Sequence, residues 1–82
     1  MNIYSHRFWA QCPNDKAQIS YLLRIETGDV IMAERIEQEC RFREPIFHEE
    51  AADRLLEIFG GAQTLSATHG QVDIVTKRGI NA

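Results

Sequence analysis

The amino-terminal part of the chain alternates apolar and polar residues over two stretches, about 3–12 and about 18–26. Side chains of a β-strand point alternately to its two faces, so this alternation predicts two strands that each bury one face. The stretch Pro13-Asn14-Asp15 between them has strong turn chemistry. A turn at this point predicts a hairpin with the opposing pairs Tyr4–Ile25, His6–Leu23, Phe8–Tyr21 and Ala10–Ile19.

A second hairpin is predicted near the carboxyl end, with strands over about 63–68 and 71–77. The turn is expected at His69 and Gly70, where His69 would adopt the positive φ that histidine tolerates better than most residues. This turn pairs the apolar residues as Leu65–Ile74 and Ala67–Val72. The outward positions are polar except for Val75: Thr64, Ser66, Thr68, Gln71 and Asp73.

Two helices are predicted between the hairpins. The stretch 48–59 carries an apolar stripe at helical spacing, and Gly60 is expected as its C′ residue. The stretch 30–40 could form a helix or a strand. As a helix it would begin after Asp29 as N-cap and consist mostly of good helix formers. As a strand it would have no clean polar face, so we favour the helix.

The order of predicted elements is ββααββ, in one domain that covers residues 1–82. Each hairpin has one apolar face that must be buried. A single antiparallel sheet of two hairpins, with one or two helices packed on one face, buries all of this surface at once. We therefore expect an α+β fold of this kind.

The net charge of −3 gives the chain no overall field that would hold a polyanion. Nucleic-acid binding is therefore not expected, although Arg41, Arg43, Lys77 and Arg78 keep a weaker hypothesis of that kind open. No long apolar run suggests a signal peptide or a membrane span. We expect a cytoplasmic protein without a membrane partner.

The two cysteines, Cys12 and Cys40, are fewer than a small secreted domain usually carries for its disulfides. Free thiols in a reducing cytoplasm are the better interpretation, and a single Cys12–Cys40 bridge stays open. Cys12 is expected to be exposed at a strand end, and its backbone lies roughly 20 Å along that strand from His6, too far for a catalytic dyad. The acidic neighbourhood of Cys40 is expected to raise the pKa of its thiol.

The sequence has three histidines, His6, His48 and His69. Neither they nor the two cysteines form a closely spaced pair such as Cys-x-x-Cys or His-x-x-x-His, which usually marks a zinc site. His6 is expected on the core-facing side of its strand, and His48 is expected to cap a helix or to be exposed. The sequence therefore predicts no catalytic residue, no metal site and no cofactor.

The first hairpin leaves an unusual set of side chains on its outer face, namely Ile3, Arg7, Trp9, Leu22 and Arg24. Trp and Arg are enriched at binding hot spots, and an exposed apolar cluster usually has a function. Three interpretations are open: a partner surface, a second buried layer, or an incidental exposed patch. We favour the partner surface, and the partner could be a second copy of the chain in a homodimer.

In its size, its lone α+β domain and its lack of catalytic signatures, the chain resembles small proteins encoded by phages and prophages. Many of those proteins inhibit or redirect a host protein, so the resemblance implies a non-enzymatic protein-binding module that acts as an inhibitor or adaptor.

The ββααββ order is also similar to the repeating unit of tunnelling-fold proteins, which assemble into barrels and hold a pterin or purine with a glutamate. That similarity implies an oligomeric subunit that binds a small molecule as the alternative function. The histidine cluster of the zinc-using members has no counterpart here, and the chain is short for that family.

Overall fold

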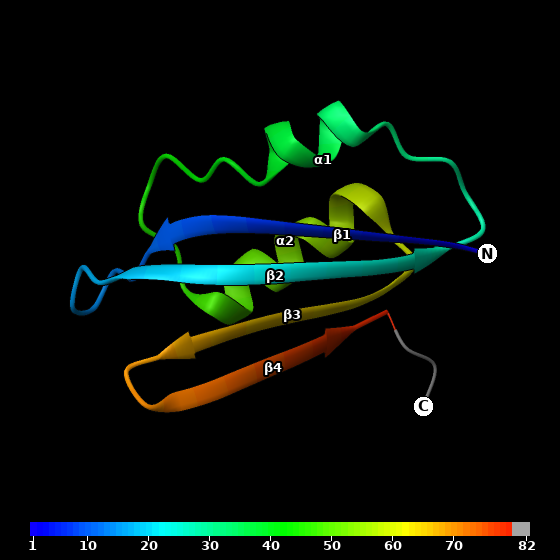
Figure 1. Ribbon diagram of the computed structural model, residues 1–82. Helices are drawn as coiled ribbons and strands as arrows, with labels where there is room; N and C mark the ends of the chain where they lie inside the picture. Colours follow the sequence, from blue (N-terminus) through cyan, green and yellow to red (C-terminus); the bar gives the residue numbers. More distant parts are fainter. Residues whose placement is uncertain (80–82) are drawn as a thin grey trace.

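The computed structural model describes residues 1–79 and shows one four-stranded sheet with two helices (Figure 1). The elements are β1 (Asn2–Gln11), β2 (Gln18–Thr27), α1 (Ala33–Glu39), α2 (His48–Phe59), β3 (Ala62–His69) and β4 (Val72–Arg78). The strands lie in the order β1-β2-β3-β4, and every neighbouring pair is antiparallel. The predicted α+β class and ββααββ order are therefore confirmed. Among these residues, no helix has the length and apolar character needed to cross a membrane.

The predicted register of the first hairpin is confirmed. Tyr4 lies opposite Ile25 and Phe8 lies opposite Tyr21, as the alternation indicated. The loop closes with two backbone hydrogen bonds, in which the Cys12 N–H donates to the Ala17 carbonyl at 2.9 Å and the Lys16 N–H donates to the Cys12 carbonyl at 2.9 Å. The hairpin therefore holds Cys12 rigidly at the point where the chain leaves β1.

The predicted register of the second hairpin is wrong by two residues. Ala67 pairs with Ile74 and not with Val72, and Leu65 pairs with Thr76 and not with Ile74. The turn is formed by Gly70 and Gln71, and Gly70 has a φ of 65°. A glycine at the first central position is typical of a type II′ turn, whose twist suits a hairpin. Because side chains repeat every two residues, the shift leaves each one on its predicted face.

The turn position also corrects the expectation for His69. His69 is the last residue of β3 and pairs with Val72, so it is not a turn residue with positive φ. Its side chain consequently keeps the fixed direction of a strand residue.

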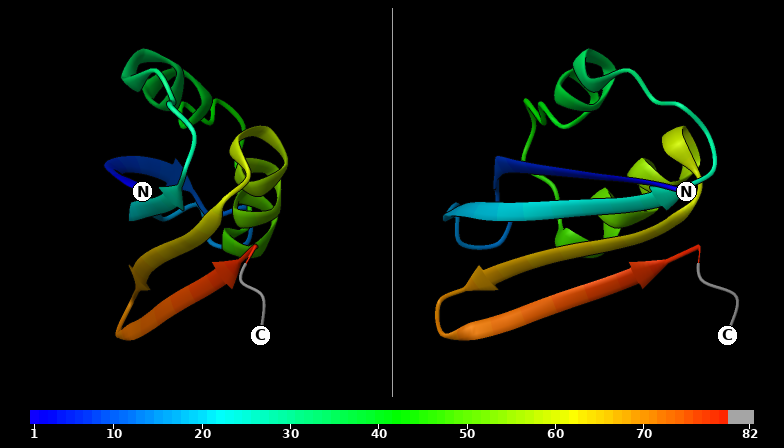
Figure 2. Two further views of the ribbon diagram at one scale, coloured as in Figure 1. Left: turned by 90° about the vertical axis from the view of Figure 1, so that its right-hand side faces the viewer. Right: turned by 45° about the vertical axis from the view of Figure 1, so that its right-hand side comes forward.

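One face of the sheet forms the floor of the hydrophobic core. The buried residues of β2 alternate along the strand as Ile19, Tyr21, Leu23 and Ile25. Helix α2 lies across this face (Figure 2), and its two alanines, Ala51 and Ala52, are buried together with Leu55. Small residues at this contact let the helix approach the sheet closely. Helix α1 lies beyond the β1 edge in Figure 1 and contributes Ile36 to the same core.

Helix α1 is shorter than the predicted stretch 30–40, although its helical character is confirmed. It begins after Met32, and Asp29 does not cap it. The preceding segment is held in a non-helical conformation by side chains of β1. The Asn2 side-chain amide donates to the Asp29 carbonyl at 3.0 Å, and the Ile31 N–H donates to the Tyr4 hydroxyl at 3.0 Å. These long-range hydrogen bonds override the local helix propensity.

The bounds of α2 match the predicted stretch 48–59, and its end is tied to β3 by Gln63. This buried side chain donates two hydrogen bonds, to the Leu55 carbonyl at 3.1 Å and to the Gly60 carbonyl at 2.8 Å. The Gly60 carbonyl lies past the last residue of the helix and has no partner within it, so Gln63 satisfies a group that the helix leaves unpaired. Gly61 then takes the chain past β2, where a Cβ would lie 2.7 Å from the Glu26 carbonyl oxygen.

Replacing Gln63 with Met keeps a side chain of similar length but removes both donors. We expect Gln63→Met to lower the free energy of unfolding by about 1–3 kcal/mol, because both side-chain hydrogen bonds are lost and the Gly60 carbonyl is left without this partner. Urea denaturation followed by circular dichroism measures the change. The matched control is Gln71→Met at the exposed turn, for which we expect a change within about 0.5 kcal/mol. Equal effects of the two substitutions would contradict the capping role.

Candidate functional site

The five residues predicted for partner binding share the outer face of the sheet. Ile3, Arg7 and Trp9 alternate with the inward-facing residues of β1, and Arg7 lies opposite Leu22 of β2. Trp9 is 64% exposed and Ile3 is 55% exposed, whereas Leu22 is partly buried. In residues 1–79, both helices pack toward the opposite face, so the possibility of a second buried layer finds no support in this part of the chain.

Arg24 belongs to the same face but is engaged by its own strand. Its guanidinium forms an ion pair with the Glu26 carboxylate at 2.6 Å, and both side chains are exposed to solvent. A solvent-exposed pair of this kind contributes little to stability. It does neutralise Arg24 locally, which leaves Arg7 as the stronger positive group among the five.

The outer surface extends over all four strands, which the sequence did not indicate. The strand registers align Arg7, Leu22, Ser66 and Val75 in one row across the sheet. Val75 is 57% exposed and adds apolar surface from β4. A shallow concavity of about 330 Å³ lies on this face, lined by Arg7, Ser20, Leu22, Ser66, Ala67, Thr68 and Asp73. We call this whole surface, from Ile3 and Trp9 to Val75, the outer face.

The four basic residues considered for nucleic-acid binding do not form one patch. Arg41 and Arg43 lie in the connection between α1 and α2, at the opposite edge of the molecule from β4 (Figure 1). They share their concavity with Glu39 and Glu44. On β4, Arg78 donates to the Asp53 carboxylate at 2.6 Å. This distribution does not provide the basic stripe that phosphate binding needs.

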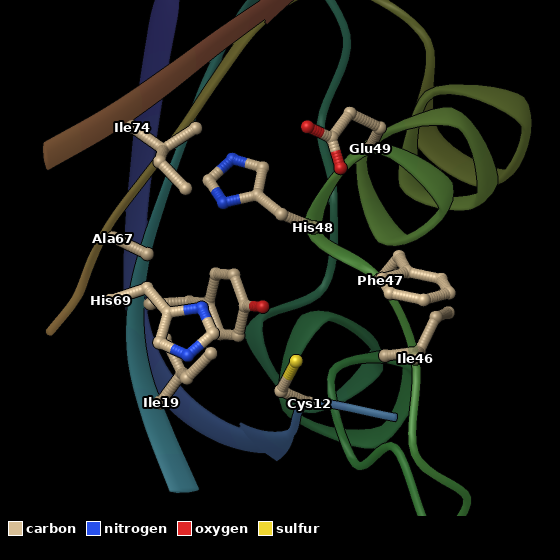
Figure 3. Close-up of a pocket in the computed structure, with 10 residues that line it drawn as sticks. Cys12, Ile19, Ile46, Phe47, His48, Glu49, Ala67, His69 and Ile74 are labelled. Carbon is tan, nitrogen blue, oxygen red and sulfur yellow. The ribbon is translucent and has the colours of Figure 1, made fainter. Parts of the chain in front are cut away.

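A second candidate site lies where the loop of the first hairpin, the start of α2 and the hairpin of β3 and β4 meet (Figure 3). It is a cleft of about 80 Å³. Apolar groups line most of it, among them Ile19, Ile46 and Ile74. The polar residues that line the same space are Cys12, Tyr21, His48, Glu49 and His69. The volume is well below the roughly 300–1,000 Å³ of a typical small-molecule site, so the cleft suits an ion or a few waters better than an organic ligand.

Three potential metal ligands converge at the rim of this cleft. One ligand atom each from Cys12, Asp15 and His69 lies within 4.8 Å of the other two. His69 Nε2 and Asp15 Oδ2 form a hydrogen bond of 2.7 Å. Asp15 also accepts a hydrogen bond from the Ala17 N–H at 3.1 Å. The pKa of the Asp15 carboxyl is lowered by hydrogen bonds from the Ala17 backbone, from His69 and from the Cys12 thiol.

The sequence reasoning missed this cluster because its members are distant along the chain. His69 reaches Cys12 and Asp15 only through the pairing of β2 with β3, which places Tyr21 opposite Ala67 and carries the end of β3 toward the hairpin loop. Cys12 is also buried, contrary to its expected exposure. No spacing rule based on adjacent ligands could have found a site assembled in this way.

His48 is a buried polar group of the same cleft and not an exposed residue at the helix start. Only 7% of it is exposed. Its Nε2 lies 2.9 Å from the Leu65 carbonyl oxygen, which can only accept a hydrogen bond, so Nε2 carries the proton. In a neutral ring Nδ1 is then an acceptor, and it has no hydrogen-bond partner among the described residues. The ring also packs edge-on against Tyr21, with centroids 5.2 Å apart.

The remaining predictions for the histidines and cysteines have clear outcomes. His6 is partly buried and stacks on Phe8, with ring centroids 6.3 Å apart, which confirms its core-facing position. Cys12 and Cys40 are both free thiols. The pKa of the Cys40 thiol is raised to about 12, first by burial and then by the charge of Glu39.

Comparisons with protein-family models, with curated proteins and with solved structures found no match to this chain. The geometry of the outer face and of the cleft is therefore the basis for the functional proposals.

The raised pKa of Cys40 predicts a loss of stability in alkali. The unfolded chain deprotonates this thiol near its ordinary pKa of 9.0, whereas the native protein holds it neutral to about 12. The native state therefore binds more protons above pH 9, and the contribution of Cys40 to stability decreases as the pH rises through this range. We expect the difference in free energy of unfolding between wild type and Cys40→Ala to shrink from pH 8 to pH 10 in urea titrations. A difference that stays constant would show that the thiol titrates normally in the folded protein.

Proposed function

We propose that this chain is a non-enzymatic protein-binding module of the kind that phages and mobile elements encode. It acts in the cytoplasm as an inhibitor or adaptor of a host protein. The observation that carries the proposal is the outer face, where Trp9, Ile3 and Val75 are more than half exposed on a sheet whose other side holds the core.

The energetics of this surface support association. Apolar surface that stays in water costs roughly 25 cal/mol per Å², so removing a tryptophan and neighbouring aliphatic groups from water favours a complex. Trp and Arg are also the residue types that most often dominate binding energy. Trp9 and Arg7 lie two residues apart on one strand face, beside the partly buried Leu22.

The concavity on the outer face supports a proposal about the kind of group that the partner presents. Arg7 and Asp73 line it with opposite charges, and Leu22 provides an apolar wall. A protruding side chain of another protein could occupy this space and offer an acidic group to Arg7. We therefore propose a folded protein with an apolar, locally acidic projection as the partner.

Substitution of the two central apolar residues tests this proposal. We expect the double variant Trp9→Ala/Leu22→Ser to bind the partner at least about tenfold more weakly, because a hot-spot truncation removes 2 kcal/mol or more. Quantitative cross-linking in host extract with wild-type and variant baits identifies the candidate. Binding of the purified candidate is then measured by calorimetry.

The matched control is Val30→Ser, which removes an exposed valine from the loop before α1 and leaves the outer face unchanged. Circular dichroism verifies that all variants fold. A purified partner that binds the double variant as tightly as the wild type would place the interface elsewhere. If wild type shows neither a partner nor self-association, the protein-binding proposal is wrong.

A second candidate function rests on the sequential strand order with both helices inserted between β2 and β3. This arrangement resembles the unit of the tunnelling fold, and the sheet ends in two edge strands, β1 and β4. If the edges paired between copies, an oligomeric barrel could bind a pterin or purine at subunit boundaries, where carboxylates would hold the ring. The small cleft of the single chain would not then be the ligand site.

Light scattering over a range of concentrations tests this second function. A stable oligomer is expected, and it should persist in Trp9→Ala/Leu22→Ser, because edge pairing uses backbone groups and not the outer side chains. A monomer at all concentrations would exclude the barrel. An oligomer that dissociates in the double variant would instead show self-association through the outer face.

A further inference from the structure

We propose that Cys12, Asp15 and His69 form a binding site for a divalent transition-metal ion, with Zn²⁺ as the best-suited metal. The site would lie at the rim of the cleft shown in Figure 3, away from the outer face. It is independent of the proposed protein-binding function, because none of its residues belongs to that surface.

The donor set favours zinc over the common hard cations. A thiolate, an imidazole and a carboxylate are all established zinc ligands, whereas Mg²⁺ and Ca²⁺ prefer sites made entirely of oxygen. Three protein ligands leave one tetrahedral position for water, which is the arrangement of open zinc sites. The site therefore resembles an open centre more than a closed structural one.

The geometry requires only a small local adjustment. Ligands at zinc distances of about 2.0–2.3 Å lie roughly 3.3–3.8 Å from one another in a tetrahedron. The three donor atoms already lie within 4.8 Å of each other. Cys12 and His69 are held by the hairpin loop and the end of β3, while Asp15 is exposed in that loop and can move. Metal binding would replace the hydrogen bond between His69 and Asp15 with two coordinate bonds. The Nε2 proton would move to Nδ1 of the ring or to solvent, and the Cys12 thiol proton would be released to solvent.

His48 indicates that the cleft also holds a hydrogen-bond donor such as water. Its Nδ1 is buried and without a hydrogen-bond partner among residues 1–79, and the ring lines the same cleft as Cys12 and His69. A buried acceptor left unpaired is costly, so native proteins usually satisfy it. A water molecule in the cleft could donate a hydrogen bond to Nδ1 and remove this cost.

A thiol nucleophile activated by His69 is the competing interpretation of the same three residues. It requires the thiol to bond to one ring nitrogen and the carboxylate to the other. In this structure Asp15 occupies Nε2 of His69, and the Cys12 sulfur lies within 4.8 Å of both of these ligand atoms. The ring nitrogen beside the thiol is therefore bonded to the carboxylate, and this arrangement favours a shared ion over a relay through the imidazole.

Calorimetric titration of the reduced protein with Zn²⁺ tests the proposal. We expect one Zn²⁺ per chain in the wild type, and binding at least about tenfold weaker in Cys12→Ser, His69→Gln and Asp15→Asn. Titration with Co²⁺ should give a thiolate-to-cobalt charge-transfer absorption that is absent in Cys12→Ser. Asp15→Asn changes an exposed loop residue, so it keeps the test valid if a variant at a more buried position fails to fold.

Two matched controls separate this site from adventitious binding. Cys40→Ser removes the other buried thiol, and His6→Gln removes a histidine outside the cleft; both should bind Zn²⁺ as the wild type does. No binding by the wild type, or equal binding by all three ligand variants, would overturn the proposal. The proposal would also be overturned if Cys12 bound no metal but its thiol were alkylated more slowly in His69→Gln than in the wild type. That result would identify Cys12 as a nucleophile activated by His69.

Discussion

The burial of one face of β2 is the constraint on which the rest of the structure depends. Ile19, Tyr21, Leu23 and Ile25 lie on that face and are nearly inaccessible to solvent. Because β2 is paired on both sides, its apolar residues can be covered only from above the sheet, and α2 with Leu55 provides the cover. All four strands must then place the same alternate set of positions on this side of the sheet.

The same constraint creates both candidate sites. With the helices committed to the inner face, the outer face of the described chain stays open, and its tryptophan and aliphatic residues remain in water. On the inner side, α2 begins near one end of the sheet, and its first residue, His48, enters the core there. The hairpin loop and the end of β3 close the remaining space, which becomes the cleft with Cys12 and His69 at its rim.

The fold was largely predictable because its signals are local. Alternation defined the strands, and the apolar stripe of α2 defined that helix to the residue. The failures came where distant residues compete with local preference. Asn2 and Tyr4 hold the segment before α1 in a non-helical form, so that helix starts later than its composition indicates. In the second hairpin, Gly70 selected a turn one residue later than expected, which moved the pairing by two.

The sequence by itself determined which residues face the core and which face outward, because the period of two along each strand is independent of the surroundings. That was enough to identify Ile3, Arg7, Trp9 and Leu22 as one surface. Only the tertiary structure decided that this surface continues to Val75 and that Cys12, Asp15 and His69 converge. The physical reason is that sheet order and the pairing of β2 with β3 bring together residues more than 50 positions apart, such as His69 and Asp15. No periodicity within a single strand encodes such a contact.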